Sequence, residues 1–312
     1  MTASSFLEVD RARIVYGSLI AVHDVSLNVA RGETAGLVGE SGSGKTSLGK
    51  ALACLIELAG GAIRLEGADL RTLAAADQLA FRRRIQMMFQ DPVSSLSPRL
   101  KVRSLLAEPI RVHDLPFVES WQRVEALMSR LGLAPELLDK YPHQLSGGQA
   151  RRVAIVRALI LNPALVVCDE PTAGLDVSVQ GELLNLMRDL QAEHALTYFI
   201  ISHNLTVIRR VTDRVAVMYL GEIVETGPTD ALFAAPAHPY TAALIAATPT
   251  IDPARRREQI VLPGEIPSPR DPPPGCRFHP RCLHAQERCR REPPAPQTIG
   301  AGRTVACHFP LS

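Results

Sequence analysis

The sequence feature that most constrains this chain is the glycine-rich stretch GESGSGKT, which runs from Gly39 to Thr46. It fits the pattern G-x-x-x-x-G-K-[ST], follows an apolar run at residues 34–38 and opens a predicted helix at residues 45–57. The glycines allow successive backbone N–H groups to point inward, and the helix N-terminus adds the positive end of its dipole. We therefore expect a phosphate-binding loop between a strand and a helix of an α/β fold.

Further apolar runs of strand length support this fold. A helical pattern, for example at residues 179–193, separates them, which indicates a doubly wound α/β core. Residues 6–16 and 19–29 instead alternate between apolar and polar, as strands of an antiparallel sheet exposed on one face do. The strands expected to be buried on both faces of a parallel sheet are residues 34–38, 85–89, 164–168 and 197–201.

Two regions depart from the strand pattern. Residues 91–149 contain helical candidates at 102–111 and 120–131, which we interpret as a helical insertion. From residue 249 onward the chain holds thirteen of its 24 prolines, so long helices are not expected there. With 312 residues, the chain is long enough for a large α/β domain and an appendage.

The charge and the hydropathy exclude some classes. The 34 Lys and Arg residues nearly balance 32 Asp and Glu residues, and a net charge of +2 gives no reason to expect a nucleic-acid partner. No secretory signal is recognisable at the N-terminus, and no apolar run of about 18 residues predicts a membrane span. We expect a cytosolic chain that reaches a membrane only through partners.

Reactive side chains follow the predicted parallel strands. Asp169 and Glu170 end a buried apolar run, where Asp169 suits a Mg²⁺-linked role and Glu170 can polarise an attacking water as general base. His203 can contact a γ-phosphate, and Gln90 can sense Mg²⁺ or the water, although each alone would be unremarkable. Ligands of open α/β sheets bind outside the carboxyl ends of the strands, so a catalytic site is expected there.

The phosphate loop supplies the remaining hydrolytic groups. Lys45 is expected to reach the β and γ phosphates, and the hydroxyl of Thr46 to hold Mg²⁺. The predicted catalytic set is therefore Lys45, Gln90, Glu170 and His203, and the predicted magnesium ligands are Thr46, Gln90 and Asp169. The motif by itself does not separate kinases, GTPases and transporter ATPases.

A second glycine-containing turn decides the family. The sequence LSGGQ at residues 145–149 precedes a helix, and a serine with two glycines at a helix start is a second surface for phosphates. It resembles the ABC signature motif. Together with the phosphate loop, Gln90, Asp169–Glu170, the AGLD sequence that ends at Asp176, and His203, it makes residues 6–248 resemble an ABC ATPase.

The resemblance implies a P-loop NTPase (RecA-like) core with an antiparallel β subdomain, a helical subdomain at about residues 91–160, and a small Cys/Pro-rich extension at residues 249–312. It also implies a dimer in which the signature turn of one chain contacts the ATP of the other. Ala150-Arg151 departs from the more usual pair of long polar residues, which is not expected to abolish activity. The implied nucleotide-binding residues are Tyr16 (stacked on adenine), Gly39, Glu40, Ser41, Gly42, Ser43, Gly44, Lys45, Thr46, Ser47, Ser146, Gly147, Gly148, Gln149 and Asp176.

A narrower resemblance concerns the oligopeptide and dipeptide importers. The sequences MFQDP from Met88, SLSP from Ser95, HPYT from His238 and GEIPSP from Gly264 resemble their ATPase subunits; related members serve nickel or glutathione uptake. The resemblance implies a heterodimer with a similar ATPase, two transmembrane permeases and an extracytoplasmic solute-binding protein. The chain would then lie at the cytoplasmic face of the inner membrane, held peripherally by the permeases.

Four cysteines in the extension leave several readings open. Cys276, Cys282, Cys289 and Cys307 are separated by five, six and 17 residues. Disulfides are disfavoured in a reducing cytosol. Zinc is possible, although zinc pairs usually lie two to four residues apart. Four thiolates can hold a [4Fe–4S] cluster, which some members of the importer family carry in this region; unmetallated thiols are the remaining alternative.

The expected function is therefore that of an ATP-hydrolysing importer subunit. One rival is a non-transport ABC ATPase, but such proteins usually carry tandem ATPase domains or long coiled coils, and the sequence predicts neither. A second rival is a redox or metal sensor whose main function lies in the cysteines.

Overall fold

The computed structural model describes residues 5–91, 95–248, 260–300 and 302–311. The predicted domain boundary at residue 249 lies outside these residues. No helix within the described ranges combines the length and the apolar character that crossing a membrane requires.

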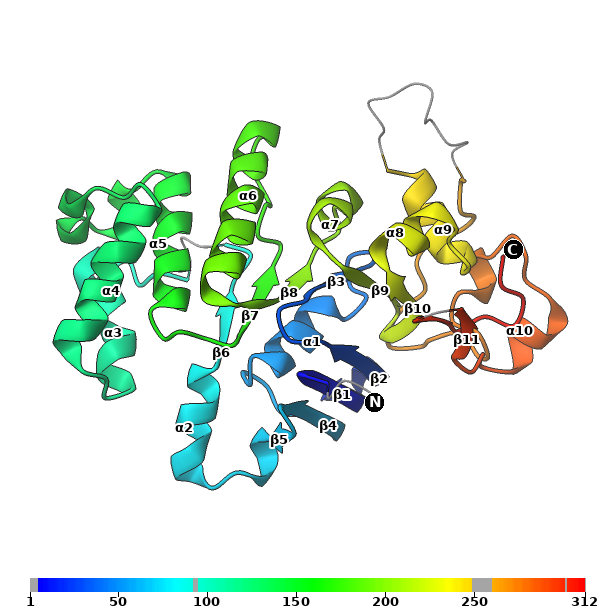
Figure 1. Ribbon diagram of the computed structural model, residues 1–312. Helices are drawn as coiled ribbons and strands as arrows, with labels where there is room; N and C mark the ends of the chain where they lie inside the picture. The colour runs from blue at the N-terminus through cyan, green and yellow to red at the C-terminus, as the bar shows by residue number, and fades with distance from the viewer. Residues whose placement is uncertain (1–4, 92–94, 249–259, 301, 312) are drawn as a thin grey trace. The chain divides into compact units, whose positions relative to one another are not determined.

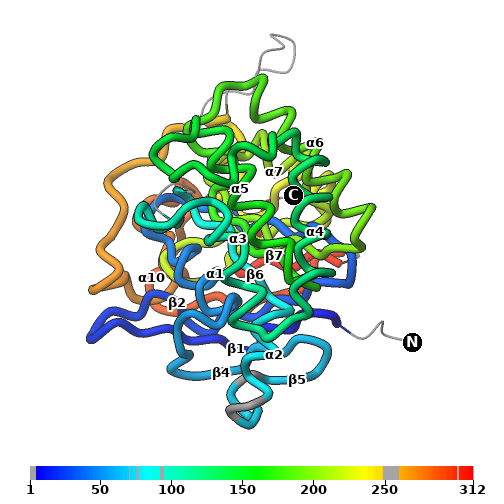
Figure 2. Tube along the Cα trace, turned by 90° about the vertical axis from the view of Figure 1, so that its left-hand side faces the viewer, coloured from blue at the N-terminus to red at the C-terminus, as the bar shows by residue number. Residues whose placement is uncertain are grey.

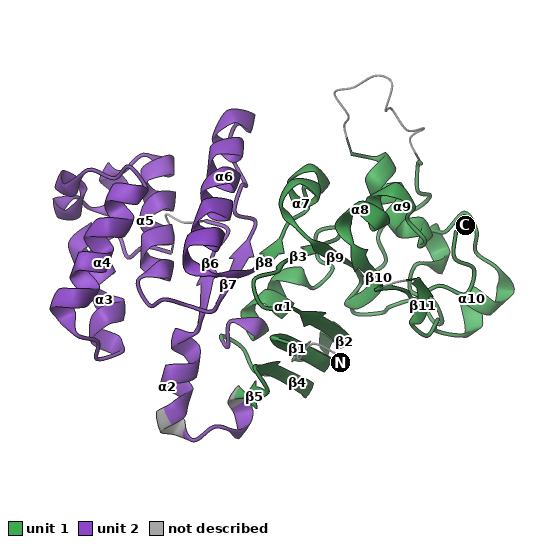
Figure 3. Cartoon of the chain, viewed as in Figure 1, with its two compact units in different colours: residues 1–51, 55–69, 199–312 green, residues 52–54, 70–198 purple. Residues whose placement is uncertain are grey.

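Two compact units divide the chain (Figure 3). Unit 1 comprises Met1–Ala51, Leu55–Asp69 and Phe199–Ser312, and unit 2 comprises Leu52–Cys54 and Leu70–Tyr198. The boundary near residue 198 falls within strand β8 (Thr197–Ile201), whose five residues are all buried. Each unit is described by itself below.

The first sheet of unit 1 is antiparallel and has the order β2-β1-β4-β5. Its strands are β1 (Leu7–Tyr16), β2 (Leu19–Val29), β4 (Gly60–Leu65) and β5 (Ala68–Asp69). The alternation in the sequence of β1 becomes an alternation of burial, so the predicted antiparallel strands are confirmed. The core-facing residues of β1 are Leu7, Val9, Ala12 and Ile14.

The second sheet of unit 1 has the order β11-β12-β10-β9-β3. β3 (Thr34–Val38) is buried throughout and runs parallel to β9 (Arg214–Tyr219). The other strands are antiparallel neighbours: β10 (Glu222–Pro228), β11 (Gln297–Gly300) and β12 (Arg303–Val305). Because β12 pairs with β10, the C-terminal extension adds two strands to the core sheet.

The helices of unit 1 are short (Figure 1). α1 (Lys45–Leu52) ends earlier than the predicted helix at residues 45–57, because Cys54 adopts a left-handed backbone conformation with φ 59°. The extension holds only one helical turn each of α10 (Glu287–Arg291) and a 3₁₀ segment (His279–Arg281) within its described residues, as its prolines predict. The remaining helices are α7 (Leu205–Val211), α8 (Thr229–Ala234) and α9 (Pro239–Ala246).

Unit 2 combines a helical bundle with two parallel strands. Helices α3 (Val102–Val112), α4 (Phe117–Arg130) and α5 (Gly147–Leu159) lie side by side (Figures 1 and 2) and bury apolar faces such as Leu105, Val124 and Val156 against one another. The predicted helical insertion is thus confirmed as helical. The other elements are α2 (Ala75–Arg83), α6 (Val177–His194), β6 (Ile85–Met88), β7 (Leu165–Asp169) and 3₁₀ turns at Leu70–Thr72, Pro135–Asp139 and Pro142–Gln144.

Candidate functional site

The phosphate loop lies in unit 1, between β3 and α1, and two of its glycines, Gly39 and Gly44, are sterically required. A Cβ on Gly39 would lie 2.1 Å from the carbonyl oxygen of Met218, and a Cβ on Gly44 would lie 2.3 Å from that of Ala21. Both residues also have positive φ angles, 156° and 104°. The neighbouring strands therefore shape this loop, and only glycine fits at these two positions.

Lys45 spans the inside of the loop. Its side chain is buried, and Nζ donates hydrogen bonds to the carbonyl oxygens of Gly39 and Glu40, both at 2.8 Å. The loop is anchored from outside as well, because the N–H of Glu40 donates to Tyr240 Oη at 2.8 Å. Thr46 follows in the first turn of α1, where it is exposed. The loop thus presents an ammonium group and a hydroxyl on one short stretch.

Two further predicted residues belong to unit 1. His203 is exposed two residues after the end of β8, and Asn204 beside it caps α7 by accepting hydrogen bonds from the N–H groups of Thr206 and Val207. This cap fixes the turn that carries His203. Tyr16 ends β1 with 47% of its surface exposed, which leaves its ring open to a flat ligand.

The predicted acidic pair lies in unit 2, at the carboxyl end of β7. Asp169 and Glu170 are 4% and 8% exposed, and Glu170 has a left-handed backbone with φ 52°. Such a conformation is costly for a non-glycine residue and recurs at functional sites. Burial raises the pKa of the preceding Cys168 thiol, so that residue is a neutral member of the core. Two carboxyl groups therefore stand at the end of a buried, apolar strand.

Gln90 lies at the same edge of the sheet within unit 2, after the carboxyl end of β6. β6 and β7 are parallel, with Met88 opposite Cys168, so the chain continues from both strands in the same direction. Gln90 is exposed two residues after Met88. The structure therefore brings Gln90 and Asp169 to the carboxyl ends of neighbouring strands, as the sequence predicts.

The signature turn in unit 2 is a capping box. Ser146 Oγ accepts a hydrogen bond from the N–H of Gln149 at 3.2 Å, and Gln149 Oε1 accepts one from the N–H of Ser146 at 3.0 Å. A Cβ on Gly147 or Gly148 would meet no atom within 4 Å. The chain itself does not need glycine here, so these glycines leave space for a group outside it.

Asp176 caps the start of α6, and Arg151 connects the signature helix to the turn before it. Asp176 Oδ1 caps α6 by accepting hydrogen bonds from Val179 N–H at 3.0 Å and Ser178 Oγ at 2.6 Å, and the Ser178 bond contributes most to lowering the pKa of the Asp176 carboxyl. Arg151, in α5, donates from Nη2 to the carbonyl oxygen of Ala173 at 2.9 Å. Sequence reasoning noted Arg151 only as an unusual residue and missed this contact, which couples the two turns.

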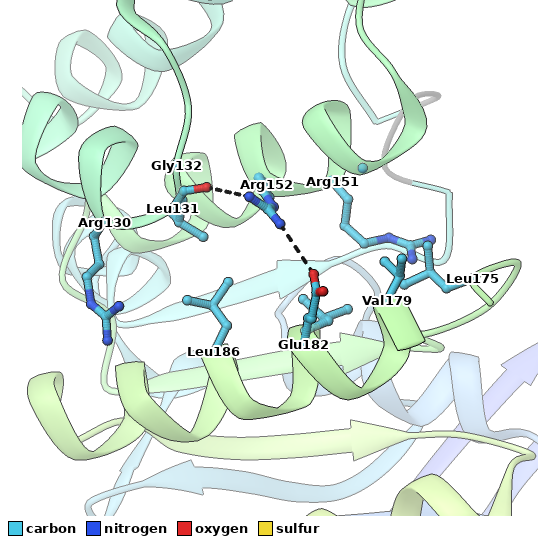
Figure 4. A pocket seen from close by; sticks show the side chains of 11 residues that line it. Arg130, Leu131, Gly132, Arg151, Arg152, Leu175, Val179, Glu182 and Leu186 are labelled. Carbon is cyan, nitrogen blue, oxygen red and sulfur yellow. Dashed lines mark hydrogen bonds and ion pairs between the residues drawn. The ribbon is translucent and has the colours of Figure 1, made fainter. Parts of the chain in front are cut away.

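A cavity of about 310 Å³ lies behind the signature turn, lined from α5, α6 and the turn after α4 (Figure 4). Arg152 crosses it: Nη1 donates to the carbonyl oxygen of Leu131 at 2.9 Å, and Nη2 lies 3.9 Å from Glu182 Oε2. Leu186 and Val179 form part of its apolar wall. Arg152 therefore contacts both the turn after α4 and α6 across this cavity.

The four-cysteine prediction is not supported by the side-chain arrangement. Cys276, Cys282, Cys289 and Cys307 are free thiols, and burial is the main reason that the pKa of Cys276 rises to about 12. Among the residues that the structure describes, no group of three or more His, Cys, Asp or Glu side chains is arranged to hold a metal ion. The neighbouring cysteines also contribute to raising the pKa of Cys276, so the four residues influence one another, and an iron–sulfur cluster or zinc remains a prediction.

Comparisons with known proteins identify the family. The family described as ABC transporter matches residues 22–173, and the one described as oligopeptide/dipeptide transporter, C-terminal region, matches residues 224–289. The probable peptide ABC transporter ATP-binding protein y4tS of Sinorhizobium fredii is 50% identical over 291 residues, which cover 92% of this chain and 82% of that protein. The chain belongs to the ABC transporter family.

Other ABC proteins agree with this assignment. The di/tripeptide transport ATP-binding protein DppF of Pseudomonas aeruginosa is 45% identical over 92% of this chain and 89% of its own length. The ATP-binding cassette MJ0796, solved as a dimer in a post-hydrolysis state with ADP and Pi, superposes with a TM-score of 0.64 at 26% identity, covering 72% of this chain and 98% of that chain. The predicted fold class and the predicted ATPase subunit of a transporter are thereby confirmed.

Proposed function

We propose that this ABC ATPase energises the uptake of oligopeptides or dipeptides. Two observations support the solute class: the C-terminal match at residues 224–289, and relatives whose names specify peptide or di/tripeptide transport. Nickel and glutathione are the alternative solutes. The observation that supports ATP binding is Lys45, which is buried and donates hydrogen bonds to two carbonyl oxygens inside a loop whose Gly39 and Gly44 admit no Cβ.

The predicted hydrolytic residues have separate roles. In unit 1, the loop N–H groups and Lys45 bind the β and γ phosphates, and His203 orients the attacking water beside the γ-phosphate. In unit 2, Glu170 acts as general base on an attacking water, and Gln90 positions a water. Tyr16 stacks on the adenine. A Mg²⁺ ion, which would neutralise charge on the phosphates, suits the oxygen donors of Thr46, Gln90 and Asp169.

The signature turn acts on a second chain. Ser146, Gly147, Gly148 and Gln149 form a capped helix start with open space in front, which suits the γ-phosphate of ATP bound to a partner. Asp176 then links the two sites across the dimer. The dimer of MJ0796 with ADP and Pi supports this arrangement. We propose a heterodimer with a similar ABC ATPase as the partner.

The remaining partners follow from an importer. We propose two transmembrane permeases, bound near Gln90 and the helical subdomain at about residues 91–160, and an extracytoplasmic solute-binding protein. The chain would lie peripherally on the cytoplasmic face of the membrane. The ATPase domain would comprise residues 6–248 and the extension residues 249–312. Iron and sulfide analysis of protein purified without oxygen tests whether the cysteines rearrange to hold a cluster.

An uptake assay tests the proposed function. Cells that lack the chain are complemented with the wild type or with Lys45→Ala, and the uptake of a labelled dipeptide and a labelled longer peptide is measured beside nickel and glutathione. We expect peptide uptake with the wild type only. Uptake of nickel or glutathione instead would reassign the solute, and equal peptide uptake with Lys45→Ala would contradict the proposed role of the phosphate loop.

A further inference from the structure

The segment between Cys276 and Cys282 contacts the phosphate loop within unit 1. Arg281 donates two hydrogen bonds to the carboxylate of Glu40, the second residue of the loop: Nη1 to Oε2 at 2.7 Å and Nη2 to Oε1 at 3.0 Å. This bidentate geometry is the strongest arrangement of a guanidinium and a carboxylate. The Arg281 side chain is only 8% exposed and that of Glu40 24%, so water competes weakly for either group.

Aromatic rings hold both partners of this ion pair. Tyr219, Tyr240 and Phe278 pack together, with ring centroids 4.7 to 5.4 Å apart, and the guanidinium carbon of Arg281 lies 5.9 Å from the Tyr219 ring centroid. Tyr240 also accepts the hydrogen bond from the N–H of Glu40 at 2.8 Å. One cluster therefore fixes the backbone and the side chain of the same loop residue.

A second arginine of the segment reaches the loop indirectly. Arg277 donates from Nη1 to the carbonyl oxygen of Leu220, and its Nε lies 2.9 Å from Glu222 Oε1. Gly221, which follows Leu220 in the chain, donates its N–H to the carbonyl oxygen of Ser43, inside the loop, at 2.9 Å. The segment thus supports the loop at two separate points, Glu40 and Ser43.

The position of Glu40 gives the ion pair an electrostatic consequence. A free carboxylate in a loop that binds a polyanion would repel it. We propose that Arg281 is a positioning residue of the nucleotide site, which holds Glu40 in place and cancels its charge so that the loop accepts a triphosphate. The proposal rests on the proposed function of the loop, and it makes the C-terminal extension a part of the ATP site.

Equilibrium binding of ATP and ADP to the full-length chain, in the presence of Mg²⁺, tests this role. Arg281→Gln leaves Glu40 charged and is expected to weaken ATP binding about tenfold, and ADP binding less, because ADP carries less charge. Adding Glu40→Gln to Arg281→Gln removes the repelling charge and restores most of the lost affinity. Arg288→Gln, which breaks only the exposed pair with Glu292 in the same C-terminal extension, is the matched control and leaves binding unchanged.

The outcomes separate the possible failures. Unchanged ATP binding by a folded Arg281→Gln chain, or a loss that Glu40→Gln does not relieve, overturns the proposal. If Arg281→Gln does not fold, Arg281→Lys, which keeps the charge but not the two-point geometry, carries the test: an intermediate loss supports the proposal and wild-type affinity overturns it. Lys45→Ala is measured in parallel, and wild-type ATP binding by that variant would instead show that the proposed function of the loop is wrong.

Discussion

The two glycine-containing turns of this ATPase differ in what their glycines are for. In the phosphate loop, the backbone of neighbouring strands approaches so closely that a Cβ on Gly39 or Gly44 would lie within 2.3 Å of a carbonyl oxygen. In the signature turn, a Cβ on Gly147 or Gly148 would meet nothing within 4 Å. The first turn is shaped by its own chain, and the second leaves room for another. Mutations at the two turns should therefore separate folding from function.

The largest effect is expected at Gly44. Gly44→Ala forces a Cβ onto the Ala21 carbonyl oxygen and should cost about 3 kcal/mol of stability and nearly all ATPase activity. Gly42→Ala is the matched control, because Gly42 also has a positive φ, 78°, but a Cβ there meets nothing within 4 Å. It should cost about 1 kcal/mol. Urea unfolding of both variants measures the difference, and equal losses would show that contacts do not shape the loop.

The next effect concerns function alone. Gly147→Val places a bulky side chain in the open space before the signature turn, so the assembled transporter should lose about 100-fold or more in ATPase turnover, as expected when a transition-state contact is blocked. The free energy of unfolding should not fall, because valine favours a helix more than glycine does. Wild-type turnover in a folded variant would remove the reason for proposing a second chain at this turn.

Ser146 distinguishes the cap from the proposed phosphate contact. Ser146→Ala should cost about 1 kcal/mol of stability, because Gln149 loses its capping oxygen. Ser146→Asp keeps a good cap, and its stability should match the wild type, but its negative charge faces the partner's phosphates and should stop turnover. Thermal unfolding and ATPase assays of the two variants check this opposite ordering. A fully active Ser146→Asp variant would mean that no phosphate comes near the turn.

The last prediction is a pH dependence of the free energy of unfolding at His238. This buried residue caps α9, with Nδ1 accepting a hydrogen bond from Tyr240 N–H at 3.1 Å, and burial lowers its pKa to about 3. The unfolded chain protonates His238 near its ordinary pKa of about 6.5, so stability is complete above that pH and falls as the pH drops toward 3. The slope should approach about 1.4 kcal/mol per pH unit. Urea unfolding at pH 7.5 and 5.0 should show that His238→Asn, which can still cap, loses this part of the slope.

Local patterns made much of the fold predictable. Runs of apolar residues at Thr34–Val38 and Thr197–Ile201 predict buried strands because both faces of those strands are covered. The serine of the signature turn predicts a helix start because capping depends on residues three positions apart. The candidate residues of the site were named for the same reason: each follows a strand or opens a helix.

Contacts between distant segments were not predictable in this way. Arg281 and Glu40 are 241 residues apart, and a buried ion pair leaves no spacing or periodicity in the sequence. The contact from Arg151 to Ala173 was missed for the same reason. The four cysteines remain a prediction, because their clustering in the sequence suggests a metal site and no metal-holding group is found among the residues that the structure describes.

The central claim is that a nucleotide is bound by the lysine loop of one chain and by the signature turn of another. Light scattering of the Glu170→Gln chain mixed with its partner ATPase and Mg-ATP tests this most directly, because binding should persist while slow hydrolysis traps the closed pair. For the Glu170→Gln chain with its partner, we predict the mass of a dimer. When Gly147→Val is also introduced into both subunits at the matching position, we predict the masses of separate chains that still bind ATP. A dimer that forms equally with the blocked signature turns would contradict it.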